Sequence, residues 1–401
     1  MTANTNQETR EQSQLIFQNG LALLQQGKFE DADKLFLQAH ALDKNNADAL
    51  NFLGIRSYQK QDYQSALDFL NQANQLNPDS AQTLSNLGLV HNALFEFSEA
   101  LRFFNLAIHC NPNIPEIYNN RGNALKGIGK NADAGIAYEN AIALRPNYAE
   151  ALNNQGVLLL ESGKPEKAIA LFEKAIAAQP HFAMVFNNLG NALAQLEHYQ
   201  DAFQCFERAL QINPGYLDAC LNYGNSLKKC KRYEEAIDCY QHALKIHSND
   251  AKAFYLLGEA YYEIGDCDLA KTYYAKSLEI QPANIEAQAA LAMAQIPKVA
   301  KTVNELSESR SAFSQQITFL QTAIQRLPGA VLEEKSIARH PFYLAYQDEN
   351  NKSLLSQFGT ICAALAEPIQ VKLDAKKVVV DPSLKIRVGI VSSFICNHPV
   401  W

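Results

Sequence analysis

Glycine recurs at a fixed interval of 34 residues along most of this 401-residue chain. The series comprises Gly20, Gly54, Gly88, Gly122, Gly156, Gly190, Gly224 and Gly258. A fixed period of this length is typical of proteins that stack copies of one small structural unit. The interval therefore constrains the fold more strongly than length or composition does, because it predicts a row of similar units that pack on their neighbours.

Further registers keep the same interval. Alanine occupies Ala32, Ala66, Ala100, Ala134, Ala168, Ala202, Ala236 and Ala270. A mostly aromatic series follows at Phe36, Leu70, Phe104, Tyr138, Phe172, Phe206, Tyr240 and Tyr274. A small residue then recurs at Ala39, Ala73, Ala107, Ala141, Ala175, Ala209, Ala243 and Ser277. Proline closes most units, at Pro78, Pro112, Pro146, Pro180, Pro214 and Pro282, where it ends a helix because it cannot continue the helical hydrogen bonding.

These spacings indicate two antiparallel helices in each unit. Helices approach closely only where glycine or alanine faces the partner helix, and the aromatic side chain fills the space beside them. The pattern resembles that of the tetratricopeptide-repeat family over residues 13–284. This resemblance implies an all-α, superhelical solenoid of eight repeats whose first helices line the concave side.

Asparagine has a register of its own, two positions before the glycine. It comprises Asn86, Asn120, Asn154, Asn188 and Asn222. Asparagine is a mediocre helix former, costing roughly half a kcal/mol relative to alanine, so its recurrence inside helices requires an explanation. One explanation is a hydrogen bond that packs neighbouring helices. The other is a row of amides that binds the peptide groups of an extended chain without reading its side chains.

The second explanation resembles the asparagine ladder of the O-GlcNAc transferase family, which holds protein substrates. On that resemblance we expect these five residues to bind extended peptides or proteins. The corresponding positions of the flanking repeats hold Gln18, Phe52 and Leu256, so the expected ladder covers only the middle of the array.

Composition excludes several other classes of function. The net charge is -7, from 42 acidic and 35 basic residues, which disfavours nucleic acid as the main partner. No apolar run of about 18 residues suggests a membrane span or a signal peptide, so we expect a cytoplasmic protein. No Cys-x-x-Cys pair occurs among Cys110, Cys205, Cys220, Cys230, Cys239, Cys267, Cys362 and Cys396, so we expect reduced thiols and neither a metal site nor a cofactor.

The repeat period does not extend to either end of the chain. Residues 1–12 are polar and are expected to form a tail. Residues 285–297 predict a capping helix that ends at Pro297, and residues 298–384 predict a helical linker region. Two apolar faces with helical spacing support the linker prediction. They comprise Phe313, Ile317, Leu320 and Ile324, and then Leu354, Phe358, Ile361 and Leu365.

Residues 385–401 have a different character. The apolar run at residues 386–391 is suited to a buried parallel strand, and Asn397, His398 and Pro399 follow it. The run and its loop, together with the segment at residues 339–346, resemble the connector and the first strand of the catalytic domain in bacterial members of the O-GlcNAc transferase family. This resemblance implies an incomplete α/β glycosyltransferase domain in which His398 is a candidate catalytic base. An unspecific role for this histidine, in packing or capping beside the proline, is the alternative.

Two functions follow from these patterns. The resemblance implies the amino-terminal, acceptor-binding part of an enzyme that transfers N-acetylglucosamine from UDP-N-acetylglucosamine to Ser or Thr hydroxyls of proteins. Because the sequence stops at Trp401, before any donor site, we expect the chain as given to be inactive in sugar transfer. The alternative is a non-catalytic repeat scaffold for protein–protein interaction. The donor sugar, the acceptor proteins and homodimerisation stay open.

Overall fold

The computed structural model describes residues 2–297, 302–325 and 350–370, and every regular element in these ranges is an α-helix. The chain divides into two compact units, Met1–Ser248 and Asn249–Trp401. The first unit contains α1 (Thr2–Gln25), α2 (Phe29–Leu42), α3 (Ala47–Gln59), α4 (Tyr63–Leu76), α5 (Ala81–Ala93), α6 (Phe97–Cys110), α7 (Pro115–Gly127), α8 (Asn131–Leu144), α9 (Ala149–Glu161), α10 (Pro165–Ala178), α11 (Ala183–Gln195), α12 (Tyr199–Ile212), α13 (Leu217–Lys229) and α14 (Tyr233–Ile246). The second contains α15 (Ala251–Ile264), α16 (Cys267–Ile280), α17 (Ile285–Ala294), α18 (Val303–Gln325) and α19 (Lys352–Gln370).

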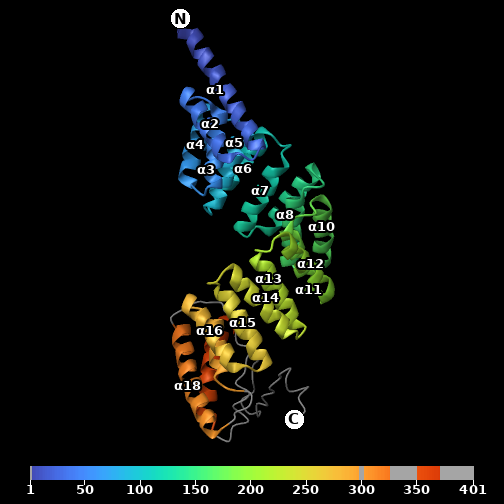
Figure 1. The fold of residues 1–401 in the computed structure, drawn as a ribbon, viewed down its shortest axis with the longest axis vertical. Coiled ribbons are helices and arrows are strands. Elements are labelled where there is room, and N and C mark those ends of the chain that lie inside the picture. The colour runs from blue at the N-terminus through green and yellow to red at the C-terminus, as the bar shows by residue number, and fades with distance from the viewer. Residues whose placement is uncertain (1, 298–301, 326–349, 371–401) are drawn as a thin grey trace, which may run out of the picture. The chain divides into compact units, whose positions relative to one another are not determined.

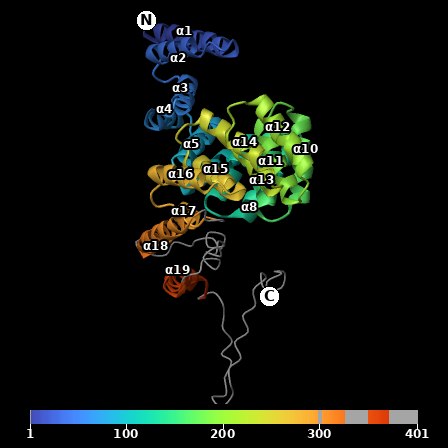
Figure 2. The same cartoon turned by 60° about the horizontal axis from the view of Figure 1, so that its bottom comes forward.

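Within each unit, consecutive helices form hairpins that pack on the next hairpin in chain order. Figure 1 labels the helices, and Figure 2 shows the first hairpin, α1 with α2, from a second direction. The first helix of every repeat carries the recurrent glycine, and the second carries the alanine and aromatic registers. The predicted all-α array of helical hairpins is therefore confirmed.

The glycine and aromatic registers meet inside each hairpin. A Cβ atom added at Gly156 would lie only 2.5 Å from Cε1 of Phe172, and one at Gly54 would lie 2.5 Å from Cγ of Leu70. The aromatic rings at this position are completely buried or nearly so. The glycine is thus required because the ring of the second helix occupies the space of its missing side chain.

The turn inside each hairpin has a left-handed residue at one fixed register. Four of these residues are glycines and four are not: Gly27, Gln61, Phe95, Gly129, Gly163, Glu197, Lys231 and Gly265, with φ between 60° and 94°. Only glycine adopts this conformation without steric cost. The turn geometry therefore follows from the hairpin packing even where the sequence lacks a glycine.

The ends of the array differ from the simple expectation. Residues 2–12 form the first turns of α1, because no proline or glycine interrupts them before the apolar part of the helix. In the second unit, α17 packs on both α16 and α18. Phe313 and Ile317 of α18 are completely buried in a cluster that includes Phe358 of α19. The expected connector at 339–346, the strand at 386–391 and His398 lie outside the described residues.

Candidate functional site

The five asparagines of the predicted ladder, Asn86, Asn120, Asn154, Asn188 and Asn222, occupy equivalent places in α5, α7, α9, α11 and α13. We call them the ladder residues. All five belong to the first unit and stand on the first helix of their hairpin. Asn86 is buried, whereas the other four are half-buried and retain contact with solvent.

Four ladder residues donate a hydrogen bond to the preceding repeat. In each case the acceptor is an asparagine 35 residues earlier, one position before the ladder position. The Nδ2–Oδ1 distances are 2.9 Å from Asn86 to Asn51, 3.0 Å from Asn154 to Asn119, 2.8 Å from Asn188 to Asn153 and 2.9 Å from Asn222 to Asn187. Each of these four amides therefore uses one of its two N–H groups in a hydrogen bond that packs neighbouring repeats together.

The remaining ladder residue, Asn120, differs from the others. The position 35 residues earlier holds Ser85, and Asn120 forms no side-chain hydrogen bond to any of the residues that the structure describes. Its amide is half-buried and has all of its hydrogen-bonding capacity unused within that part of the chain. The row of inter-repeat bonds is thus interrupted at this place.

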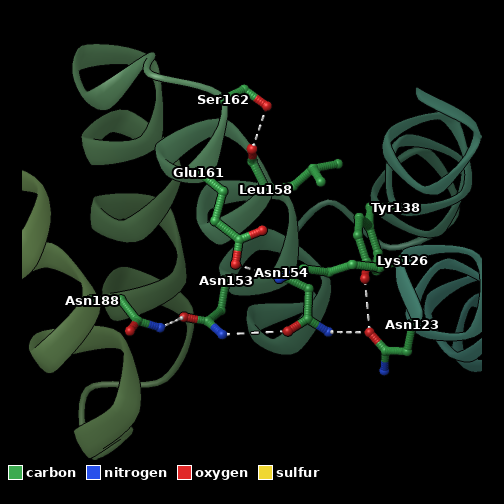
Figure 3. Close-up of polar contacts among 9 residues, drawn as sticks. All are labelled: Asn123, Lys126, Tyr138, Asn153, Asn154, Leu158, Glu161, Ser162 and Asn188. Atoms are coloured by element: carbon green, nitrogen blue, oxygen red, sulfur yellow. Dashed lines mark hydrogen bonds and ion pairs between the residues drawn. The ribbon is translucent and has the colours of Figure 1, made fainter. Parts of the chain in front are cut away.

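The bonded amides form a chain that donates in one direction. Figure 3 shows Asn188 donating to Asn153, Asn153 to Asn154 at 3.4 Å, and Asn154 to Asn123 at 3.2 Å. Asn123 also accepts the hydroxyl hydrogen of Tyr138 at 2.8 Å. The links from Asn188 to Asn153 and from Asn154 to Asn123 run from a later repeat to an earlier one, and the link from Asn153 to Asn154 joins them within α9. Because the bonds form one donor-to-acceptor chain, they polarise one another and fix the orientation of the amides.

The ladder retains capacity for a ligand. A side-chain amide offers two N–H donors and two acceptor lone pairs. Asn188 and Asn222 use one N–H each in the inter-repeat bonds, so a second N–H and part of the carbonyl capacity remain. Asn154 has both of its acceptors nearby, Asn119 and Asn123, and keeps only carbonyl capacity. Peptide groups need a donor and an acceptor, and the ladder supplies both.

Sequence reasoning missed the partners of the ladder. The acceptor asparagines at 119, 153 and 187 stand next to ladder positions in the sequence. Asn123 and Asn225 lie three positions after a ladder residue, and each accepts a hydrogen bond from the tyrosine of its own hairpin, Tyr138 or Tyr240. A second asparagine series with the same 34-residue step was the signal that could have identified the acceptors.

No reactive nucleophile is built into α12–α14. Burial raises the pKa of Cys205 and of Cys220 to about 11, and that of Cys239 to about 12. The Sγ atom of Cys220 lies 3.3 Å from Nδ1 of His242, yet this thiol is almost completely buried. These thiols therefore stay protonated at neutral pH and serve as small apolar side chains.

Among residues 2–297, 302–325 and 350–370, no three His, Cys, Asp or Glu side chains are grouped so that they could hold a metal ion. No helix in the same ranges combines the length and the apolar character that crossing a membrane requires. His398, the candidate catalytic base, lies outside these ranges.

Comparisons with known families agree with the hairpin architecture. Models described as "Tetratricopeptide repeat" match residues 17–81, 119–181, 155–216 and 251–284, and one described as "TPR repeat" matches residues 224–265. Together these matches cover more than half of the chain. A search of curated proteins finds no match.

Solved structures with a similar fold include the APC/C hetero-tetramer Cut9-Hcn1, with 21% identity and a TM-score of 0.57. That match covers 70% of this chain and 55% of the other, so the present chain spans about half the length of that relative. The type IV pilus biogenesis factor PilW has 19% identity, a TM-score of 0.50 and coverages of 53% and 98%. A tetratricopeptide repeat protein from Parabacteroides merdae ATCC 43184 has 17% identity, a TM-score of 0.50 and coverages of 62% and 98%. At these identities the likeness concerns the fold alone.

Proposed function

Because this chain is a tetratricopeptide-repeat protein, we propose that it is a scaffold that binds other proteins by an extended segment laid along the ladder residues. The observation that carries the proposal is the placement of one asparagine amide on the first helix of five consecutive hairpins, with four of the five half-buried and four held by an inter-repeat bond. This row of amides is regular because the hairpins are regular. The peptide groups of an extended chain are also regularly spaced, so one segment can contact several amides of the row.

The chemistry of the ladder favours binding of the peptide backbone. Each amide can donate to a peptide carbonyl or accept from a peptide N–H, and neither bond depends on the side chain of the ligand. The inter-repeat bonds hold the amides in place before binding, which lowers the entropy lost when the ligand arrives. The proposed site therefore accepts many sequences, provided that the segment is extended and unstructured.

Replacement of the five ladder residues by alanine tests the proposal. The probe is a short, labelled, unstructured peptide of glycine, serine, threonine and alanine with both ends blocked. We expect its affinity to fall by at least about tenfold, because each lost hydrogen bond contributes about 0.5–1.5 kcal/mol. Helicity at room temperature should persist, although the melting temperature should fall because four of the inter-repeat bonds are also lost.

Two controls separate backbone binding from other effects. Replacing the exposed Asn71 and Asn140 of α4 and α8 by alanine should leave the affinity unchanged. A peptide of the same sequence with N-methylated amides lacks N–H donors and should bind weakly to the unmodified protein. Equal binding of the methylated and unmethylated peptides, or unchanged binding by the five-alanine variant, would refute the proposal.

A finer proposal concerns what happens to the bound segment. The resemblance of residues 339–346 and 386–399 to the O-GlcNAc transferase family supports a role in presenting acceptor proteins for transfer of N-acetylglucosamine from UDP-N-acetylglucosamine. In that role His398 is the candidate base for the acceptor hydroxyl, since imidazole titrates near neutral pH. The support for this second proposal is the sequence resemblance alone.

Labelled UDP-N-acetylglucosamine and a mixture of proteins test the finer proposal. Label on serine or threonine that disappears in the His398→Ala variant would support transfer by this protein. Absence of label with the native full-length gene product would remove the transferase proposal. Peptide binding by the ladder would stand in either case, because the two measurements are independent.

A further inference from the structure

We propose that the asparagines Asn51, Asn119, Asn153 and Asn187 are positioning residues that orient the ladder amide of the following repeat, and that Ser85 leaves the amide of Asn120 without such an orienting bond. We call these four the anchor residues. The inference rests on the proposed function of the ladder. It adds that the ladder consists of two parts, separated at the fourth repeat, and that one serine causes the separation.

The geometry of the bonds is the same wherever an anchor is present. The four bonds join Nδ2 of a ladder residue to Oδ1 of an anchor at 2.8–3.0 Å. Asn119, Asn153 and Asn187 are only 5%, 2% and 4% exposed, so they have little surface to offer a ligand. The ladder residues of the same bonds in α9, α11 and α13 are half-buried. Asn119, Asn153 and Asn187 therefore act on a ligand only through the amides that they hold, whereas Asn51 is half-buried and holds the buried Asn86.

The bond restricts the rotation of the ladder amide. An asparagine side chain rotates about two bonds, and a single hydrogen bond to a buried acceptor fixes which N–H points into the array and which points outward. An amide that is already fixed loses less entropy when it binds a peptide group. The anchored residues Asn188 and Asn222 are thus prepared for binding, whereas Asn120 must become ordered on contact.

Ser85 explains the exception. It occupies the anchor position of the third repeat and is only 5% exposed, which is similar to Asn119, Asn153 and Asn187. The hydroxyl oxygen of serine lies one bond nearer to the backbone than the amide oxygen of asparagine, and no hydrogen bond joins Ser85 to Asn120 among the described residues. Asn154, Asn188 and Asn222 therefore form one prepared set, and Asn86 stands apart from it.

Two reciprocal substitutions test the inference with residues that the chain itself uses. Ser85→Asn supplies the missing anchor, and Asn153→Ser copies the natural gap into the bond to Asn188. With the blocked Gly/Ser/Thr/Ala peptide as probe, we expect Ser85→Asn to bind about threefold to tenfold more tightly and Asn153→Ser about threefold to tenfold more weakly, the usual effect of immobilising one side chain. Asn187→Ser provides a second test of the loss, should Asn153→Ser fold poorly.

A spectroscopic readout distinguishes positioning from mere stability. In Ser85→Asn the side-chain amide of Asn120 should gain protection from hydrogen exchange, and in Asn153→Ser that of Asn188 should lose it. The gain from Ser85→Asn should vanish when Asn120 is alanine, because a double-mutant cycle isolates the pair. A changed affinity, measured at a temperature at which circular dichroism shows both variants fully folded, supports positioning.

The outcomes separate the two proposals. If the five-alanine variant loses peptide binding but Ser85→Asn and Asn153→Ser bind as the unmodified protein does, the ladder binds peptides and the positioning inference is wrong. A gain in Ser85→Asn that persists with alanine at position 120 also refutes positioning. If the five-alanine variant binds normally, the proposed function itself fails.

Discussion

The contact between glycine and an aromatic ring determines the hairpin at the scale of single residues. Gly156 allows the ring of Phe172 to lie where a Cβ would be, at 2.5 Å. We predict that Gly156→Ala destabilises the protein by about 1–3 kcal/mol, because the ring must move within a packed core. Chemical denaturation followed by circular dichroism measures this change.

The matched control for that substitution is Gly135, which lies inside α8 with an ordinary helical conformation. A Cβ there would meet only Cδ2 of Leu158, at 3.5 Å. Gly135→Ala should therefore stabilise the protein by about 0.5–1 kcal/mol through its higher helix propensity. A loss of stability at Gly135 similar to that at Gly156 would show that the close approach is not the cause.

The sequence predicts the contacts within a hairpin but not the contacts between hairpins. The spacing of glycine and aromatic residues was sufficient to predict the hairpin, because both lie within one unit. The partner of a ladder residue was not predictable, because it depends on how far one hairpin is shifted along the next. Likewise Glu197 and Lys231 adopt left-handed turns without the glycine that would signal them.

Adjacent helices of different repeats are joined by a buried carboxylate near the start of the array. Asp33 of α2 accepts hydrogen bonds from Nε of Arg56 in α3, at 2.7 Å, and from Nζ of Lys60, at 2.8 Å. Burial alone would raise the pKa of Asp33, but the hydrogen bonds and charges of Arg56 and Lys60 outweigh it and lower the pKa. The link therefore favours the ionised carboxylate in the folded state.

This lowered pKa predicts a pH dependence. A carboxyl group whose pKa is lower in the folded protein stabilises the fold above its unfolded pKa of about 3.9 and loses that effect as the pH falls through the folded value. Asp33→Asn should cost about 1–3 kcal/mol at pH 7 and progressively less below about pH 4. Asp31→Asn, which removes an exposed pair with Lys34, should change stability little at either pH. A constant cost of Asp33→Asn down to pH 3 would contradict the explanation.

At the two ends of the array, the sequence pattern predicts the helices less completely than it does within the repeats. Residues 2–12 have no apolar period, so periodicity alone could not distinguish a tail from the helical extension that α1 contains. In the second unit the apolar faces of α18 and α19 were visible in the sequence, and Phe313 and Phe358 are buried accordingly. The hairpin partners of these helices were not apparent, because the repeat registers do not continue past residue 284.

At the scale of the molecule, the ladder residues and their anchors all belong to Met1–Ser248. We predict that a fragment of residues 1–248 stays helical and binds the blocked peptide with an affinity within a factor of about two of the whole chain, because repeat arrays derive stability from neighbouring units. Circular dichroism and fluorescence anisotropy measure the two quantities. A well-folded fragment that fails to bind would show that residues beyond Ser248 are part of the site.

Each hairpin closes its own contact between the glycine and the large side chain of the second helix. In α9 and α11 the first helix also gives one amide bond to the preceding hairpin and takes one from the next. If one such repeat were duplicated in phase, the inserted hairpin could form the same contacts with the hairpins before and after it. The array can thus be lengthened or shortened by whole units during evolution without a new core having to be invented. Each gain or loss of a repeat would lengthen or shorten the proposed peptide site by one ladder residue.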